Sequence, residues 1–160
     1  MSPTQKNRPT RSLLRFYAAL LSGPIGIGPL YAADIFKADN ADALNTEASW
    51  VGGIVPTAAD IAVFDSSVTG SSFAIGGNLS LGGIRVQGNP SSQTINGIST
   101  VFLNLGSGGV DLSGATSGTF FEFSSPTIRL APGAQSYWKA GAGVTSTIWS
   151  NIQGLTYPGG

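Results

Sequence analysis

The chain has 160 residues, with 8 basic and 8 acidic side chains, and only 10% of its residues are charged, against about 25% in an average soluble domain. It contains no Cys and no His, which excludes a disulfide framework, a thiolate nucleophile, a Ser-His-Asp triad and zinc held by Cys or His. A neutral chain with so few charged residues also lacks the excess of Lys and Arg that is typical of nucleic-acid binders. We therefore expect no nucleic-acid partner.

Residues 1–33 have the pattern of a secretory signal peptide, in which a basic start precedes an apolar stretch and small residues. No charged residue occurs in 16–33, and two Gly-Pro pairs weaken it as a permanent membrane helix. Cleavage after Ala33 or after Ala32 is expected, and an uncleaved anchor is the alternative. The basic residues of the start are Lys6, Arg8, Arg11 and Arg15.

The rest of the chain has a different charge balance. Residues 34–160 keep four basic and eight acidic side chains, a net charge of −4. We therefore expect no binding to anionic lipid by charge, and contact with a membrane only during export or through an anchor outside this sequence. Residues 34–60 are expected to form an N-terminal cap or linker.

From residue 61 onward, short apolar runs alternate with Gly, Asn, Ser and Pro, which is typical of brief β-strands. The chain is therefore predicted to be all-β after the signal peptide. The expected strands are residues 61–64, 79–81, 84–86, 101–105, 110–112, 120–123, 128–130 and 147–149.

Two segments resemble copies of one unit, 81–88 and 105–114. Each has an apolar residue, a glycine bend and an apolar–charged–apolar run, and Val86 and Leu112 are 26 residues apart. A period of about 20–26 residues indicates a β-solenoid whose coils stack on their neighbours. We expect about four coils in 61–160, stacked at about 4.8 Å, with further repeats following Gly160. An unpaired end would favour end-to-end self-association.

Several motifs resemble those of the bacterial autotransporter-associated β-strand repeat proteins, a family also called passenger-associated transport repeats. The matching segments are 50–56, 60–64, 79–84, 105–113, 135–138 and 148–154. The resemblance implies a right-handed parallel β-helix in an extracellular passenger region. It also implies a secreted or cell-surface location, associated with the outer membrane of a bacterium. The route of attachment stays open.

The carboxylates of the predicted coils are the candidate catalytic groups, because enzymes that cut polysaccharides use a paired acid and base. Asp60 and Asp65 are expected on opposite faces of one strand. Asp111 and Glu122 each stand between apolar residues, so both are expected to face outward as solvated surface charges. The alternative is that they approach each other on neighbouring coils and form a paired acid and base.

Two other patterns have a functional and a structural interpretation. Residues 39–42 offer oxygen ligands for calcium, but lack the Gly and Glu of a calcium loop. The aromatic residues Trp50, Tyr137, Trp138 and Trp149 would suit a sugar-stacking platform, but are more typical of a solenoid core or cap. The glycine-rich stretches 106–109 and 141–143 lack the Lys of a phosphate loop and are expected to be bends.

The sequence therefore predicts an exported, non-enzymatic β-helical passenger segment that serves as a cell-surface or adhesion scaffold. The alternative is a carbohydrate-active β-helix enzyme or a glycan-binding module. The expected partners are surface glycans or other cell-surface proteins. No catalytic, cofactor-binding or metal-binding residue is expected.

Overall fold

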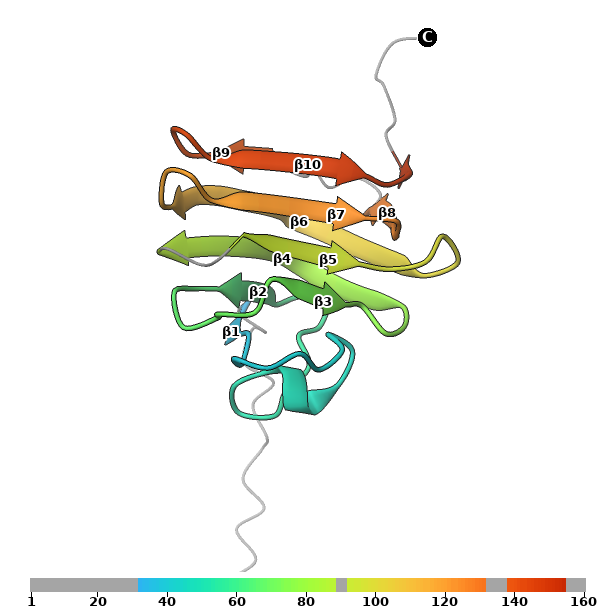
Figure 1. The fold of residues 1–160 in the computed structure, drawn as a ribbon. Helices are drawn as coiled ribbons and strands as arrows, with labels where there is room; N and C mark the ends of the chain where they lie inside the picture. The colour runs from blue at the N-terminus through green and yellow to red at the C-terminus, as the bar shows by residue number, and fades with distance from the viewer. Residues whose placement is uncertain (1–31, 89–91, 132–137, 155–160) are drawn as a thin grey trace, which may run out of the picture.

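The computed structural model describes residues 32–88, 92–131 and 138–154. These residues form a parallel β-solenoid of about four turns with almost no helix, which confirms the predicted all-β solenoid (Figure 1). The predicted signal peptide lies almost wholly outside the described residues. Among the described residues, no helix is long and apolar enough to cross a membrane.

The strands are short except for two that run along two sides of the solenoid. A single turn of 3-10 helix, η1 (Glu47–Ser49), precedes most of them. The strands are β1 (Asp34–Phe36), β2 (Ile61–Phe64), β3 (Ser72–Ala74), β4 (Leu79–Gly88), β5 (Gln93–Asn96), β6 (Phe102–Ala115), β7 (Phe120–Ser124), β8 (Thr127–Leu130), β9 (Trp138–Ala140), β10 (Thr145–Trp149) and β11 (Ile152–Gln153).

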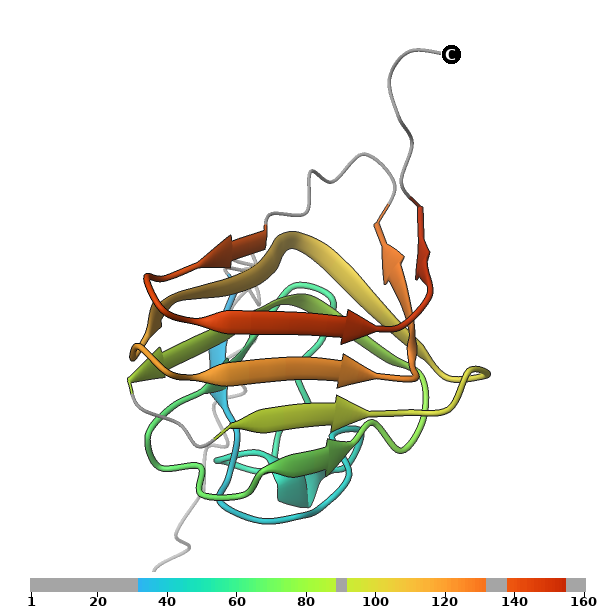
Figure 2. The same cartoon turned by 45° about the horizontal axis from the view of Figure 1, so that its top comes forward.

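The solenoid has three faces, and every pairing between these strands is parallel (Figure 2). The first face contains the N-terminal parts of β4 and β6, with β8 and β11. The second face contains β1, β2, the C-terminal parts of β4 and β6, and β9. The third face is a separate sheet in the order β10-β7-β5-β3. One coil takes one strand segment from each face.

Glycines allow β4 and β6 to turn the corner between the first and second faces. A Cβ on Gly82 would lie 2.8 Å from the carbonyl carbon of Ala59 in the coil below, and one on Gly106 would lie 3.0 Å from the oxygen of Gly82. Only glycine lets the backbones approach this closely. In each of these two coils the sequence predicted two separate short strands, one on either side of the corner. The structure has instead one bent strand in each coil, β4 and β6.

The repeat length varies from one coil and one face to the next. Ile84 pairs with Val110, which reproduces the predicted 26-residue offset. Ala62 pairs with Ile84 at 22 residues, and Ile95 pairs with Phe123 at 28. The predicted period of 20–26 residues was therefore too narrow at its upper limit, because the corners admit loops of different length while the strands keep their register.

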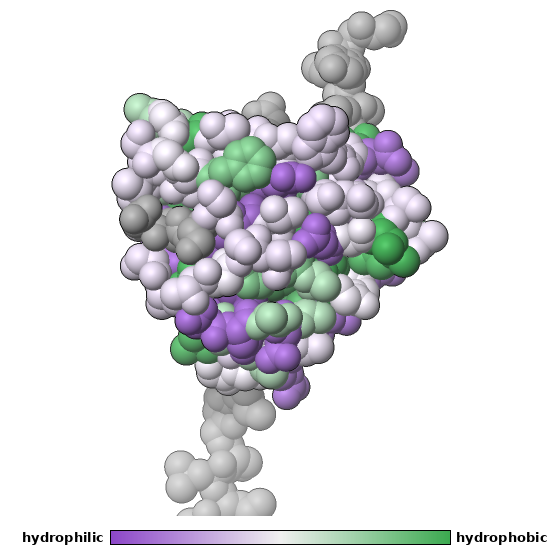
Figure 3. Space-filling view, viewed as in Figure 1, coloured by the Kyte–Doolittle hydropathy of each residue, from purple (hydrophilic) through white to green (hydrophobic). Residues whose placement is uncertain are grey.

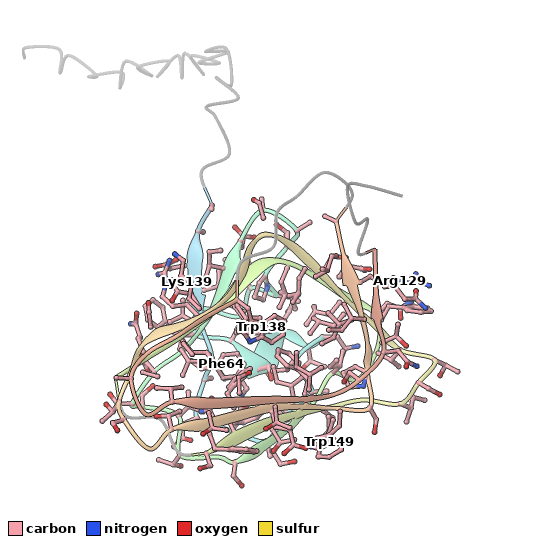
Figure 4. All side chains as sticks on the ribbon, turned by 90° about the horizontal axis from the view of Figure 1, so that it is seen from above. Phe64, Arg129, Trp138, Lys139 and Trp149 are labelled. Carbon is pink, nitrogen blue, oxygen red and sulfur yellow. The ribbon has the colours of Figure 1, made fainter. Side chains whose placement is uncertain are left out.

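The core consists of inward side chains, with a column of aromatic rings along the solenoid axis. Adjacent rings in this column meet edge to face or nearly so, with centroids 5.3–6.4 Å apart, a favoured geometry for aromatic pairs. The column runs through Trp50, Phe64, Phe121, Phe123 and Trp138. These contacts link the N-terminal end of the solenoid to its last described coil, and Figure 4 shows Phe64 and Trp138 inside the ribbon.

The N-terminal end of the solenoid is covered by the segment that follows β1 (Figure 1). An isolated antiparallel bridge joins Lys37 to Trp50, and the indole N–H of Trp50 donates to the Leu44 carbonyl at 2.8 Å. Leu44 and Trp50 are both buried. Strand β1 itself belongs to the second face, where it pairs with β2.

Candidate functional site

The structure separates the two carboxylates that were considered as a paired acid and base. Asp111 lies on the second face, in register with Arg85 and Lys139. Glu122 lies on the third face, in register with Thr94 and Thr147. Both side chains alternate with buried neighbours and so leave the core in different directions. The alternative of a paired acid and base at Asp111 and Glu122 therefore does not hold, because the two residues lie on different faces.

Three aspartates accept hydrogen bonds from the hydroxyl and N–H of a Ser or Thr two or three residues away in the chain. Asp111 Oδ1 accepts hydrogen bonds from the Ser113 hydroxyl and N–H, at 2.5 and 3.0 Å, and these bonds lower the pKa of Asp111. Asp60 Oδ2 accepts from the Thr57 hydroxyl at 2.6 Å and N–H at 2.9 Å, and its pKa is lowered for the same reason. Asp65 accepts from Ser67 in the same way. Asp60 and Asp65 lie in the turns that flank β2, where they hold the chain rather than form a paired site.

The oxygen-rich loop at residues 39–42, which was weighed as a calcium loop, contributes oxygens of Asn40 to an ammonium group of the chain itself. Lys37 is completely buried, and its Nζ donates to the carbonyls of Ala38 and Asn40 at 2.7 and 2.9 Å and to Asn40 Oδ1 at 2.8 Å. The ring centroid of Phe73 lies 4.9 Å from the same nitrogen. Burial lowers the pKa of Lys37, and the nearby carboxylates of Asp42 and Asp39 oppose that shift. The loop therefore stabilises a buried lysine.

The three described members of the aromatic set considered as one platform, Trp50, Trp138 and Trp149, do not lie together. Trp50 is buried in the core. Trp138 is half-buried and packs on Phe123, and its indole N–H donates to Ser146 Oγ at 3.1 Å. Tyr137 lies outside the described residues. Trp149 alone is exposed, to 70%. The prediction of core or cap filling is thus correct for Trp50 and Trp138 and wrong for Trp149.

The third face is nearly uncharged and is rich in short polar side chains. Thr94, Glu122 and Thr147 form one outward row across three coils. Ser72 continues this row in the coil below Thr94, and Asn96, two residues along β5, donates its amide diagonally to Ser72 Oγ at 2.5 Å. Figure 3 shows this side as largely pale, with small apolar and hydrophilic spots.

A shallow groove lies where the third face meets the first, beside Trp149. It has a volume of about 450 Å³. Ser125, which precedes β8, has a φ of +73°, a left-handed conformation that is uncommon outside glycine. The lining residues are Ser99, Ser125, Ile148, Trp149, Ser150 and Asn151.

The comparisons with known proteins add no family. No protein-family model matches the chain, and searches of curated proteins and of solved structures return no match. The function of the chain is therefore inferred from the geometry of the three faces.

Proposed function

We propose that this chain is a non-enzymatic β-solenoid scaffold that presents its outer faces at a bacterial cell surface. The supporting observation is that outward polar side chains form hydrogen bonds from one coil to the next. On the third face Asn96 bonds to Ser72, and on the first face Asn104 bonds to Ser80 in the coil below at 3.0 Å. These hydrogen bonds connect successive coils and leave polar outer faces, which suit presentation.

The separation of the carboxylates supports the non-enzymatic part of the proposal. Cleavage of a glycosidic bond by the usual mechanism needs two carboxyl groups about 5–10 Å apart on either side of the bond. Asp111 and Glu122 leave the solenoid from different faces, and Asp60 and Asp111 accept hydrogen bonds from Thr57 and Ser113, which are close to them in the chain. A scaffold needs no such pair.

The resemblance to autotransporter-associated repeat proteins is part of the same proposal. It is supported by the solenoid fold and by the parallel stacking of the segments that carry the resemblance, 79–84 and 105–113. We propose a right-handed helix, because crossovers between parallel strands of one sheet are right-handed in nearly all proteins. Residues 1–33 would direct export, which accords with their basic and apolar parts.

Cell fractionation tests the proposal directly. The full chain with a C-terminal epitope is expressed in a bacterium with an outer membrane, beside a variant that lacks residues 1–33. We expect the full chain in the envelope or medium, shortened by the signal peptide, and the deletion variant in the cytoplasm. Equal cytoplasmic retention of both forms would contradict the proposal.

A further inference from the structure

Trp149 points away from the solenoid core, and its exposure follows from its place in β10. In that strand Ser146 and Ile148 lie above Phe121 and Phe123, which are inward and buried. Trp149 lies above Ser124, on the outward row. A further coil stacked on β10 would cover its backbone edge but would leave this outward direction unchanged. Figure 4 shows Trp149 outside the ribbon of the third face.

The surroundings of Trp149 supply hydrogen-bonding groups without a strong charge. The groove beside it is lined by three serines and by Asn151, which offer hydroxyl and amide donors and acceptors. Thr147 and Glu122 lie two residues along the same face, at about 7–8 Å by strand spacing. Among the residues of β3, β5, β7 and β10, Glu122 is the only charged one.

The exposed ring of Trp149 and the uncharged polar groups around it indicate which class of ligand could bind here. A large, exposed aromatic ring carries an electron-rich face, which attracts the C–H groups on the apolar side of a pyranose ring. Hydroxyl and amide groups around it match the sugar's own hydroxyls. The absence of Lys and Arg from the described strands of this face disfavours a phosphorylated, sulfated or nucleic-acid ligand.

We propose that the third face binds a neutral polysaccharide, with one sugar ring stacked on Trp149 and its hydroxyls bonded to Asn151 and the serines of the groove. Glu122 accepts a hydrogen bond from a neighbouring sugar. A single carboxylate on this face supports binding rather than cleavage. The inference rests on the proposed scaffold role and identifies what the scaffold would contact.

The test is affinity electrophoresis of the purified full chain in gels that contain one soluble neutral polysaccharide each. The panel is a mixed-linkage β-glucan, a xylan, a galactomannan and a dextran. We expect at least one polysaccharide to retard the wild type, Trp149→Ala to bind about tenfold more weakly, and Trp149→Phe to keep part of the binding. Ile98→Ala is the matched control, because Ile98 is also highly exposed, at 65%, but lies outside the Trp149 groove.

Fluorescence gives a second readout that does not depend on migration. Because Trp50 is buried and Trp138 is half-buried, acrylamide quenching of the wild type is expected to come mainly from Trp149 and to fall when the polysaccharide is added. No retardation by any member of the panel, or equal retardation of wild type and Trp149→Ala, would overturn the inference. Normal export with no sugar binding would contradict this inference alone, whereas cytoplasmic retention of a sugar-binding chain would contradict the scaffold role alone.

Discussion

The close stacking of coils at the glycine corner can be tested by adding a single methyl group, as in Gly82→Ala. In Gly82→Ala, the new Cβ would lie 2.8 Å from the carbonyl carbon and 2.9 Å from the oxygen of Ala59, and 2.9 Å from the oxygen of Asp60. All three are backbone atoms of the coil below. Since unstrained carbon contacts are at about 3.5 Å or more, the two coils would have to separate by roughly half an ångström. We expect a loss of about 1–3 kcal/mol in the free energy of unfolding, as for other overpacked sites.

Urea unfolding of the full chain, followed by circular dichroism, measures this loss. With a slope of about 1–3 kcal/mol/M, the midpoint should fall by about 1 M. Gly114→Ala is the matched control, since its Cβ would meet Gln87 and Val86 at 3.4 Å or more. That change should be neutral or slightly stabilising, because alanine restricts the unfolded chain. Equal midpoints for Gly82→Ala and the wild type would refute the close approach of the coils at this corner.

Three further predictions concern polar groups of the folded chain. The amide of Gln93 is buried and has no hydrogen-bond partner among the described residues, so Gln93→Leu should raise the free energy of unfolding by about 1–3 kcal/mol, and a loss of stability in urea would contradict this. The Ala33 N–H donates to Asp60 Oδ1 at 3.1 Å and the Ala33 carbonyl accepts from Ile61, so mass spectrometry of the exported protein should find Ala33 as its first residue, and a start at residue 34 would count against this. Hydrogen bonds lower the pKa of Asp60 and of Asp111 in the folded state, so their stabilisation is complete above the unfolded pKa of about 4 and is lost as the pH falls through the lower folded values. The melting temperature should therefore drop on acidification below about pH 4, and a flat profile down to pH 2 would contradict that reasoning.

The solenoid was predictable because its signal is repeated along the chain. Apolar residues at alternate positions, bounded by glycine and polar turns, identified β2, β7 and β8 with bounds close to those observed. Strands β3 and β5 were missed, since Ser72–Ala74 and Gln93–Asn96 each contain one large apolar residue, Phe73 and Ile95, and no alternating apolar run. Their strand conformation is imposed by the neighbouring coils, through pairings that local sequence does not encode.

The candidate sites were harder to predict, because they depend on which face each strand occupies. The outward orientation of Asp111 and Glu122 was correct, but their separation depends on the turn between β6 and β7, which moves the chain to another sheet. For Trp149, a signal was present in the sequence. It alternates with Ile148, so one of the two had to face outward. The buried Lys37 gave no signal of its own, since its partners come from the folded loop around Asn40.

The central claim is that the outer faces of a stacked solenoid are presented at the cell surface. Because the chain contains no Cys, one introduced thiol can report both its orientation and its location. Thr147→Cys places a thiol on the outward row of the third face, and Val86→Cys places one in the buried core. On intact cells treated with a membrane-impermeant maleimide, we expect labelling of Thr147→Cys, and labelling of Val86→Cys only after denaturation. Labelling of Thr147→Cys only after the cells are lysed would contradict the account.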